Sequence, residues 1–176
     1  MKITIYVNSK SGFTRKYAEW IKEEIDCDIK QYKEIFKTKP GADDIAIFGS
    51  RLFAGKIQYL EKVKKHIRKF PAKKFIVFVS GASPQFANDI ISTVWKNNFT
   101  EAENASIPHF YMQSGLNYEK MGFVEKHLMK TVARFMNAKK DNANKDVDIR
   151  EALSKSFDMS KKQFIMPLLK YLKENC

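Results

Sequence analysis

Five short apolar stretches alternate along this chain with segments whose apolar residues have helical spacing. Successive parallel strands need such an alternation, because a crossover, usually a helix, must return the chain to the edge where the next strand begins. The predicted strands are residues 3–7, a short stretch within 27–35, and residues 44–50, 75–81 and 107–115. Residues 44–50 are almost continuously apolar, which is typical of a strand covered by helices on both faces of the sheet.

Helices are expected between most of these strands. In the first of them, apolar side chains recur three and four positions apart along one face, at Phe13, Tyr17, Trp20, Ile21 and Ile25. Further helices are predicted at residues 57–67, 86–98 and 124–135, and a last one within 160–175 that is kinked or begins near Pro167. The order predicts an α/β fold with a parallel sheet and right-handed crossovers. With 176 residues, the chain is expected to form one domain, 1–176.

Positive charge is the unusual feature of the composition. The 32 Lys and Arg residues against 20 Asp and Glu residues give a net charge of +12, which indicates anionic partners or surfaces. Nucleic acid is not the expected partner, because the sequence has no zinc-finger, RNP-like or helix–turn–helix signature. No apolar run is long enough to cross a bilayer, and the first residues lack a signal-peptide cleavage site. The sequence therefore predicts a cytoplasmic protein.

Neither a metal site nor a catalytic triad is indicated. Cys27 and Cys176 cannot form a CxxC motif, and reduced thiols are expected in a cytoplasmic protein. The three histidines, His66, His109 and His127, fall on separate predicted elements. No acid–base residue is singled out, so the catalytic residues stay unknown at this stage.

The segment "SKSGFT", Ser9 to Thr14, joins the first predicted strand to the first helix. Backbone N–H groups at a helix N-terminus favour an anion, and Gly12 lets a ligand approach the backbone closely. Three hydroxyl side chains can donate hydrogen bonds there. A Walker loop and a GxGxxG dinucleotide motif are both absent. An ordinary helix N-cap remains an alternative, since Ser and Thr are common caps.

The same segment resembles the phosphate loop of the flavodoxin-like family, which has the form [ST]-x-[ST]-G-x-T. More narrowly, the chain is similar to the menaquinone-dependent, flavodoxin-like protoporphyrinogen oxidases. This similarity also involves "IAIFGSRLFAGKI" after the third strand and "SGLNYEKMGFVEKHLMKTVARFM" after the fifth. The resemblance implies FMN as the cofactor and a doubly wound five-stranded parallel sheet in the order 2-1-3-4-5, with helices on both faces.

It also implies three groups of cofactor-binding residues. The phosphate is expected at Ser9, Lys10, Ser11, Gly12, Phe13 and Thr14. The flavin ring is expected against Ser50, Arg51, Leu52, Phe53, Ala54 and Gly55. The polar edge of the ring is expected at Ser80, Gly81, Ala82 and Ser83.

The predicted ring site departs from that of a typical flavodoxin. Phe53 is the candidate to stack on the ring, although it can instead belong to the core of a strand-to-helix turn. The loop Ser80 to Pro84 has neither a second aromatic residue nor an acid, which leaves one ring face open to a substrate. Arg51 and Lys56 flank the expected site, and a cation there would favour two-electron reduction of the flavin. The alternative is that both are solvated surface charges.

A basic stripe, Lys126, Lys130 and Arg134, is predicted on the helix at 124–135, beside an apolar band. Such a helix can lie on an anionic membrane surface or receive a carboxylate-bearing porphyrinogen. The alternative is ordinary packing on the sheet with a solvated face.

Together these features predict an FMN-dependent oxidoreductase that resembles menaquinone-dependent protoporphyrinogen dehydrogenase. A flavodoxin-type electron carrier and a general FMN-dependent quinone or NAD(P)H reductase remain alternatives. The expected partner is accordingly a redox protein, a quinone or a porphyrinogen.

Overall fold

The computed structural model describes residues 1–37, 44–69, 72–123, 126 and 155–176. The chain divides into two compact units. The first consists of Met1–Ser114 with Ser160–Cys176, and the second of Gly115–Met159. The first unit holds the sheet and is the subject of the fold described below. That residues 1–176 form one domain stays a prediction.

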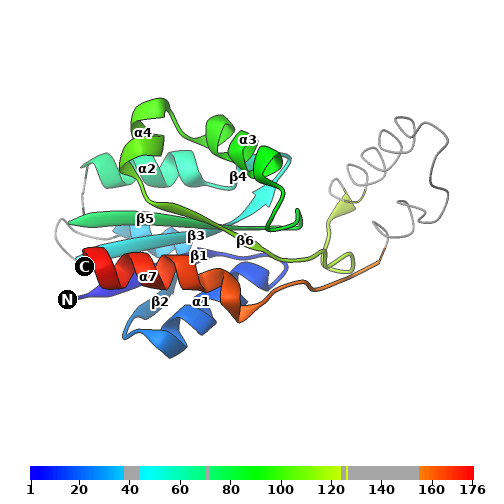
Figure 1. Ribbon diagram of the computed structural model, residues 1–176, viewed down its shortest axis with the longest axis horizontal. Coiled ribbons are helices and arrows are strands. Elements are labelled where there is room, and N and C mark those ends of the chain that lie inside the picture. Colours follow the sequence, from blue (N-terminus) through cyan, green and yellow to red (C-terminus); the bar gives the residue numbers. More distant parts are fainter. Residues whose placement is uncertain (38–43, 70–71, 124–125, 127–154) are drawn as a thin grey trace. The chain divides into compact units, whose positions relative to one another are not determined.

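The parallel sheet has the predicted strand order. Its strands are β1 (Ile3–Asn8), β2 (Asp28–Gln31), β3 (Ile45–Phe53), β5 (Lys74–Gly81) and β6 (His109–Gln113), in the spatial order β2-β1-β3-β5-β6 (Figure 1). The pairings along this path are all parallel. Counting only the five predicted strands, this is the order 2-1-3-4-5, so the flavodoxin-like fold is confirmed. The sixth strand, β4 (Lys56–Ile57), pairs antiparallel with β3 and was not predicted.

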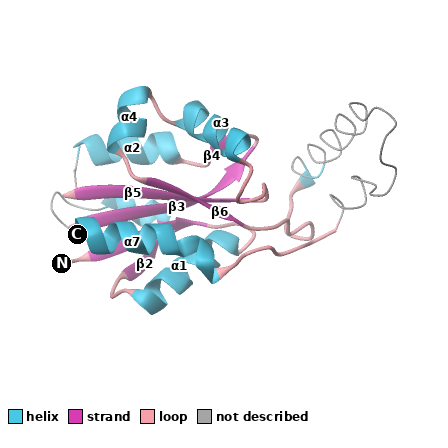
Figure 2. Ribbon diagram, in the orientation of Figure 1, coloured by secondary structure: helices cyan, strands magenta, loops and turns pink. Residues whose placement is uncertain are grey.

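Helices cover both faces of the sheet. They are α1 (Phe13–Glu24), α2 (Leu60–Lys69), α3 (Asn88–Asn98), α4 (Glu101–Ser106) and α7 (Met166–Asn175), with 3-10 turns η1 (Tyr32–Lys37) and η2 (Lys162–Ile165). Helices α1 and α7 lie on one face, and α2 and α3 lie on the other (Figures 1 and 2). Pro167 occupies the first turn of α7, where its missing N–H costs no helical hydrogen bond, as predicted.

Each face of the sheet has its own core because side chains alternate along a strand. Ile5, Ile47 and Phe78 face α1 and α7, whereas Tyr6 and Phe48 face α2 and α3. All five side chains are fully buried. The central strands thus have two apolar faces, which explains the near-continuous apolar runs in the sequence.

Two predicted boundaries differ from the observed ones because of β4, and one predicted helix is not tested. The strand predicted at 44–50 continues to Phe53, because residues Leu52 and Phe53 find partners in β4. The helix predicted at 57–67 begins only at Leu60, since Ile57 belongs to β4. The helix predicted at 124–135 lies outside the described residues, apart from Lys126.

Helix α4 was not predicted, although the sequence contains its start signal. The Oγ1 of Thr100 accepts from the backbone N–H of Glu103 at 3.2 Å, and the Glu103 carboxylate accepts from the N–H of Thr100 at 3.0 Å. This reciprocal capping box has the readable form T-x-x-E.

Candidate functional site

The turn after β1 exposes the N-terminus of α1. Gly12 is the N-cap, with φ 100°, and it supplies no side-chain cap to the helix. A Cβ added at Gly12 would meet nothing within 4 Å, so the approach to the backbone is open. A 12-residue helix therefore presents its positive end at the carboxyl edge of the sheet, where an anion is favoured. The N-cap position itself is Gly12 and not Ser or Thr, although the Ser9 hydroxyl binds one N–H of the first helical turn.

The hydroxyl side chains of this turn have different surroundings. Ser9 is half-buried, and its Oγ accepts from the backbone N–H of Arg15 at 3.2 Å. Ser11 and Phe13 are half-buried, and Lys10 is exposed. Thr14 points inward, where its Oγ1 lies 2.7 Å from the Oγ of Ser80, and both side chains are buried. The Thr14–Ser80 hydrogen bond thus joins the turn after β1 to the end of β5.

Residues 50–55 form the end of β3 and a tight hairpin. Phe53 pairs with Lys56, so Ala54 and Gly55 are the two turn residues. Their φ angles, 49° and 75°, are both positive, as a type I′ turn requires. "GSRLFAG" is therefore not a strand-to-helix loop, and sequence reasoning missed the hairpin because Ala-Gly is a weak hairpin signal.

Ser50 is directed into the protein. Its side chain is fully buried; its Oγ accepts from the Nδ2 of Asn8 at 3.0 Å and donates to the Gln58 carbonyl at 2.8 Å. Leu52 packs against the core under α2 and α3. The Ser50 side chain therefore stabilises the hairpin rather than lining a surface, whereas Leu52 is only half-buried.

Arg51 and Phe53 lie on the opposite face of β3, the face that α1 covers. Each is half-buried, and the Arg51 guanidinium carbon lies 5.4 Å from the Phe53 ring centroid. Arg51 is in register with Ser80 on β5, and Ser80 is hydrogen-bonded to Thr14. Arg51 therefore lies near the turn at residues 9–14. The pair is a cation–π contact, which leaves a half-buried aromatic ring and a positive charge together at this edge.

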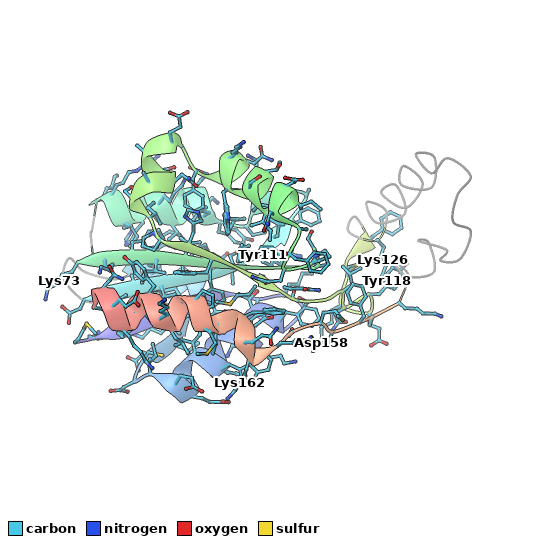
Figure 3. The ribbon with its side chains drawn as sticks, in the orientation of Figure 1. Lys73, Tyr111, Tyr118, Lys126, Asp158 and Lys162 are labelled. Carbon is cyan, nitrogen blue, oxygen red and sulfur yellow. The ribbon has the colours of Figure 1, made fainter. Side chains whose placement is uncertain are left out.

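The segment after β5 is held by the edge strand β6. The Tyr111 hydroxyl donates to the Ser83 carbonyl at 2.9 Å, and its ring fills the space beside Gly81. Burial raises the pKa of Tyr111 to about 12, although its hydrogen bonds to Ser83 act in the opposite direction. The hydroxyl therefore stays protonated and remains a donor. Figure 3 labels Tyr111, which lies at the side of the sheet where α3 packs.

Gln85 adds a second attachment, which the sequence did not suggest. Its side-chain amide donates to the Tyr111 carbonyl and accepts from the Gln113 N–H, both at 2.9 Å. The Gln113 side chain accepts from the Gln85 N–H at 2.9 Å in return. Ser80 and Gly81 end β5, while Ala82 and Ser83 begin the loop, and both loop residues are half-buried. The predicted residues at 80–83 are thus fixed in place at the same edge as residues 9–14.

Lys56 does not point toward this group of residues. Its Nζ donates to the Asn97 carbonyl at 2.6 Å, near the C-terminal end of α3, where a cation is favoured. In the second unit, the Nζ of Lys126 lies 4.9 Å from the Tyr118 ring centroid (Figure 3). The other two members of the basic stripe, Lys130 and Arg134, lie outside the described residues.

The described residues offer no other candidate centre. They contain no group of three His, Cys, Asp or Glu side chains that could hold a metal ion. Cys27 is buried, and this burial raises the pKa of its thiol to about 11, which makes it a poor nucleophile. In the part of the chain that the structure describes, no helix has the length and apolar character needed to cross a membrane.

The donor set at the carboxyl edge fits a phosphate attached to a planar ring. Residues 9–14 supply a helix N-terminus, an open glycine, hydroxyls and an ammonium group. Arg51, Phe53 and the residues at 80–83 lie at the same edge of the sheet. Ligands of open parallel α/β sheets bind at this edge, where the strand order reverses, here between β1 and β3.

Comparison with known proteins identifies a family. The family model described as a flavodoxin domain matches residues 4–146. No curated protein matches the sequence significantly.

Similar solved structures include Smu.1420 from Streptococcus mutans UA159, with 12% identity over 78% of this chain and 100% of that chain, and a TM-score of 0.42. The Trp repressor binding protein from Bacillus subtilis has 10% identity over 64% and 84% of the two chains, with a TM-score of 0.38. An NAD(P)H:quinone oxidoreductase from Methanothermobacter marburgensis has 12% identity over 81% and 97%, with a TM-score of 0.41. At such identities and TM-scores, the three structures say nothing about what this chain binds.

Proposed function

The chain belongs to the flavodoxin-domain family, and from that premise we propose that it is an FMN-binding oxidoreductase. The observation that carries the proposal is the open Gly12 turn at the N-terminus of α1. This anion site lies at the same sheet edge as the Arg51–Phe53 pair. One edge thus offers groups for both halves of a flavin mononucleotide.

The phosphate half is bound by residues 9–14. The backbone at Gly12 and the N-terminus of α1 accept the negative charge, and Ser9 and Ser11 supply hydroxyl groups. The exposed Lys10 adds a positive charge near the same turn. Thr14 positions the turn against β5 through Ser80.

The ring half is bound by the ends of β3 and β5. Phe53 provides an aromatic surface, and Arg51 provides a charge beside it. When bound, FMN supplies the electron-transfer or hydride-transfer chemistry. Arg51 contributes electrostatics, because a cation favours the negative charge that the ring gains on reduction. Residues 80–83, held by Tyr111 and Gln85, present backbone groups to the polar edge of the ring.

A direct titration tests the cofactor. Apo protein is titrated with FMN and with riboflavin, and flavin fluorescence reports binding. If the phosphate is recognised, FMN binds at least about tenfold more tightly than riboflavin, which corresponds to about 1.4 kcal/mol. Equal affinities would contradict the phosphate assignment, and the absence of any binding would contradict the function.

Within this function, we propose a porphyrinogen as the reductant and a menaquinone-type quinone as the electron acceptor. The support is the sequence resemblance and the net charge of +12, which suits a substrate with several carboxylates. The association with an anionic membrane surface, where quinones reside, belongs to the same proposal. An FMN electron carrier and a general quinone or NAD(P)H reductase are the competing functions.

An anaerobic assay separates these functions. FMN-loaded protein receives protoporphyrinogen IX and a menaquinone analogue, and protoporphyrin fluorescence is followed without oxygen. Turnover supports the dehydrogenase. Full FMN occupancy without porphyrin formation favours the carrier or the general reductase, and reduction by NADH or NADPH then distinguishes those two.

A further inference from the structure

The β3–β4 hairpin is too short to hold itself in place. Its strand pairs are Leu52–Ile57 and Phe53–Lys56 around the two-residue turn, and the Gln58 N–H donates to the Arg51 carbonyl at 3.2 Å. An isolated hairpin is marginal in water even when it is longer. Yet this hairpin continues directly from Arg51 and contains Phe53, the residues assigned to the flavin ring. Something outside the hairpin must therefore fix its position.

Asn98, near the end of α3, makes the required contacts. Its Oδ1 accepts from the Ile57 N–H at 2.9 Å, and its Nδ2 donates to the Gly55 carbonyl at 2.8 Å. The same Nδ2 donates to the Val94 carbonyl at 2.7 Å, one turn back in α3. The Asn98 side chain is buried, so these hydrogen bonds are sheltered from water. Figure 2 shows β4 beside α3.

The backbone carbonyl of Asn98 is bound by a buried lysine. The Nζ of Lys64 donates to the Asn98 carbonyl at 2.9 Å and to a Glu103 carboxylate oxygen at 2.8 Å. Lys64 is only 4% exposed, and Glu61 lies 2.7 Å from the same Nζ. The end of α3 is thus fixed from the side of α2 and α4. Hairpin, Asn98, Lys64 and Glu103 form a continuous chain of hydrogen bonds.

We propose that Asn98 is a positioning residue for flavin binding, acting through the β3–β4 hairpin; this inference rests on the proposed FMN-binding function. Asn98 acts on the hairpin backbone, at Gly55 and Ile57. It satisfies one backbone donor and one backbone acceptor of the hairpin, and so sets where Arg51 and Phe53 lie. A preorganised ring site avoids the entropy cost of ordering the hairpin when the flavin binds.

The amide is suited to this role because it donates and accepts at once. An apolar side chain of similar volume would fill the space but leave the Ile57 N–H and the Gly55 carbonyl without a partner. An aspartate would keep the acceptor for Ile57 and lose the donor for Gly55. An apolar substitution therefore removes both hydrogen bonds to the hairpin, whereas aspartate removes only the one to the Gly55 carbonyl.

The test compares Asn98→Ala and Asn98→Asp with Val94→Ala. Val94 is buried in the same helix and packs in the core that includes Ile57, so Val94→Ala destabilises the protein without removing a hydrogen bond to the hairpin. Hydrogen–deuterium exchange is measured on apo protein, and FMN and riboflavin affinities are measured by fluorescence.

We expect Asn98→Ala to increase exchange in residues 52–58 and to weaken both FMN and riboflavin about tenfold, with their affinity ratio unchanged. The ratio stays constant because the phosphate turn is not affected. Asn98→Asp should keep partial protection of the Ile57 amide, and Val94→Ala should change neither hairpin exchange nor affinity. Asn98→Asp replaces the alanine variant if the latter does not fold.

Two results would overturn the proposal. Hairpin exchange in Asn98→Ala equal to that in Val94→Ala would mean that Asn98 does not hold the hairpin. A loosened hairpin with unchanged riboflavin affinity would mean that its position does not matter to the ring. If the wild-type protein binds no flavin, the proposed function is refuted, and so is the claim that Asn98 affects flavin binding. Hydrogen–deuterium exchange of the apo protein would still show whether Asn98 holds the hairpin.

Discussion

The turn at residues 9–14 and the β3–β4 hairpin lie at the same edge of the sheet, but side chains that bind their backbone groups come from different distances in the sequence. In the turn, the Ser9 hydroxyl accepts from Arg15, six positions away, and the Gly12 carbonyl accepts from Lys16, in the first turn of α1. The hairpin instead depends on Asn98, which lies 41 and 43 positions from the residues it contacts.

In the proposed site, the phosphate would therefore depend on local structure and the flavin ring on tertiary structure. A phosphate needs backbone donors and a helix end, which six consecutive residues can supply. A flavin ring needs a surface of fixed orientation, which a short hairpin supplies only when another element holds it. The two halves of the site should therefore respond separately to mutation, and the following experiments test that separation.

The largest effect is expected at the turn. Gly12 has φ 100°, a conformation that costs an L-residue about 1–2 kcal/mol. Gly12→Val should shift the turn out of this conformation in the apo protein, so that FMN binding, which restores it, weakens about 5- to 30-fold at 1.4 kcal/mol for each tenfold change; riboflavin binding should change little. Fluorescence titration measures both affinities, with Gly12→Ala as a milder variant. A parallel loss of riboflavin binding would show that the two halves are not separate.

Reversing the charge of Arg51, beside Phe53, should change the redox potential of the bound flavin ring. Arg51→Glu should lower the two-electron midpoint potential of bound FMN by about 30 mV or more, equivalent to about 1.4 kcal/mol. Spectroelectrochemical titration measures it. Arg51→Lys, which keeps the charge, and Lys173→Glu, which makes the same change on exposed α7, serve as controls. A shift of equal size in Lys173→Glu would reveal only a net-charge effect.

Acid should weaken the support of the hairpin through Glu103. Burial by itself raises the pKa of Glu103, but hydrogen bonds from Lys64, the Thr100 N–H and Arg68 outweigh it and lower the pKa to about 2. Because the folded-state pKa lies below the ordinary 4.5, the ionised carboxylate stabilises the fold above pH 4.5. That stabilisation is lost as the pH falls from 4.5 toward 2.

Glu103→Gln removes this titration. Urea unfolding between pH 2 and pH 6 should therefore show a steeper loss of stability in the wild type than in Glu103→Gln. Hydrogen exchange over the same range should show the hairpin opening before the turn at 9–14. Parallel stability curves for the two proteins would contradict the role given to Glu103.

The smallest effect is expected at the hairpin turn. Ala54 has φ 49°, where glycine is favoured, so Ala54→Gly should stabilise the protein by up to about 1 kcal/mol. The matched change Ala102→Gly, inside helix α4, should instead destabilise it by about 0.5–1 kcal/mol. Thermal unfolding of both variants measures the difference. Destabilisation by Ala54→Gly would mean that the turn does not have the conformation described.

Much of the fold was readable because it follows from periodicity. The apolar runs predicted the five parallel strands, and the helical face from Phe13 to Ile25 predicted α1, since each pattern reports which side chains a regular element must bury. The resemblance to flavodoxin-like proteins supplied the strand order. The capping box of Thr100 and Glu103 was present in the sequence, so α4 could have been predicted as well.

The hairpin could not be read in the same way. Residues 50–57 contain no Asn-Gly or Asp-Gly signal, and β4 is only two residues long. The inward direction of Ser50 was likewise missed, because one of its partners, Asn8, lies on an element distant in sequence.

By itself, the sequence determined most of the elements and the turn at residues 9–14, because their backbone hydrogen bonds join residues a few positions apart; the Thr14–Ser80 side-chain contact, 66 positions apart, came from the tertiary structure. Only the tertiary structure decided which side chains of residues 50–56 face inward and what holds the hairpin. The physical reason is that a buried backbone N–H or carbonyl needs a partner, and any element that folds nearby can provide it. For Ile57 and Gly55 that partner is Asn98, whose role no local pattern indicates.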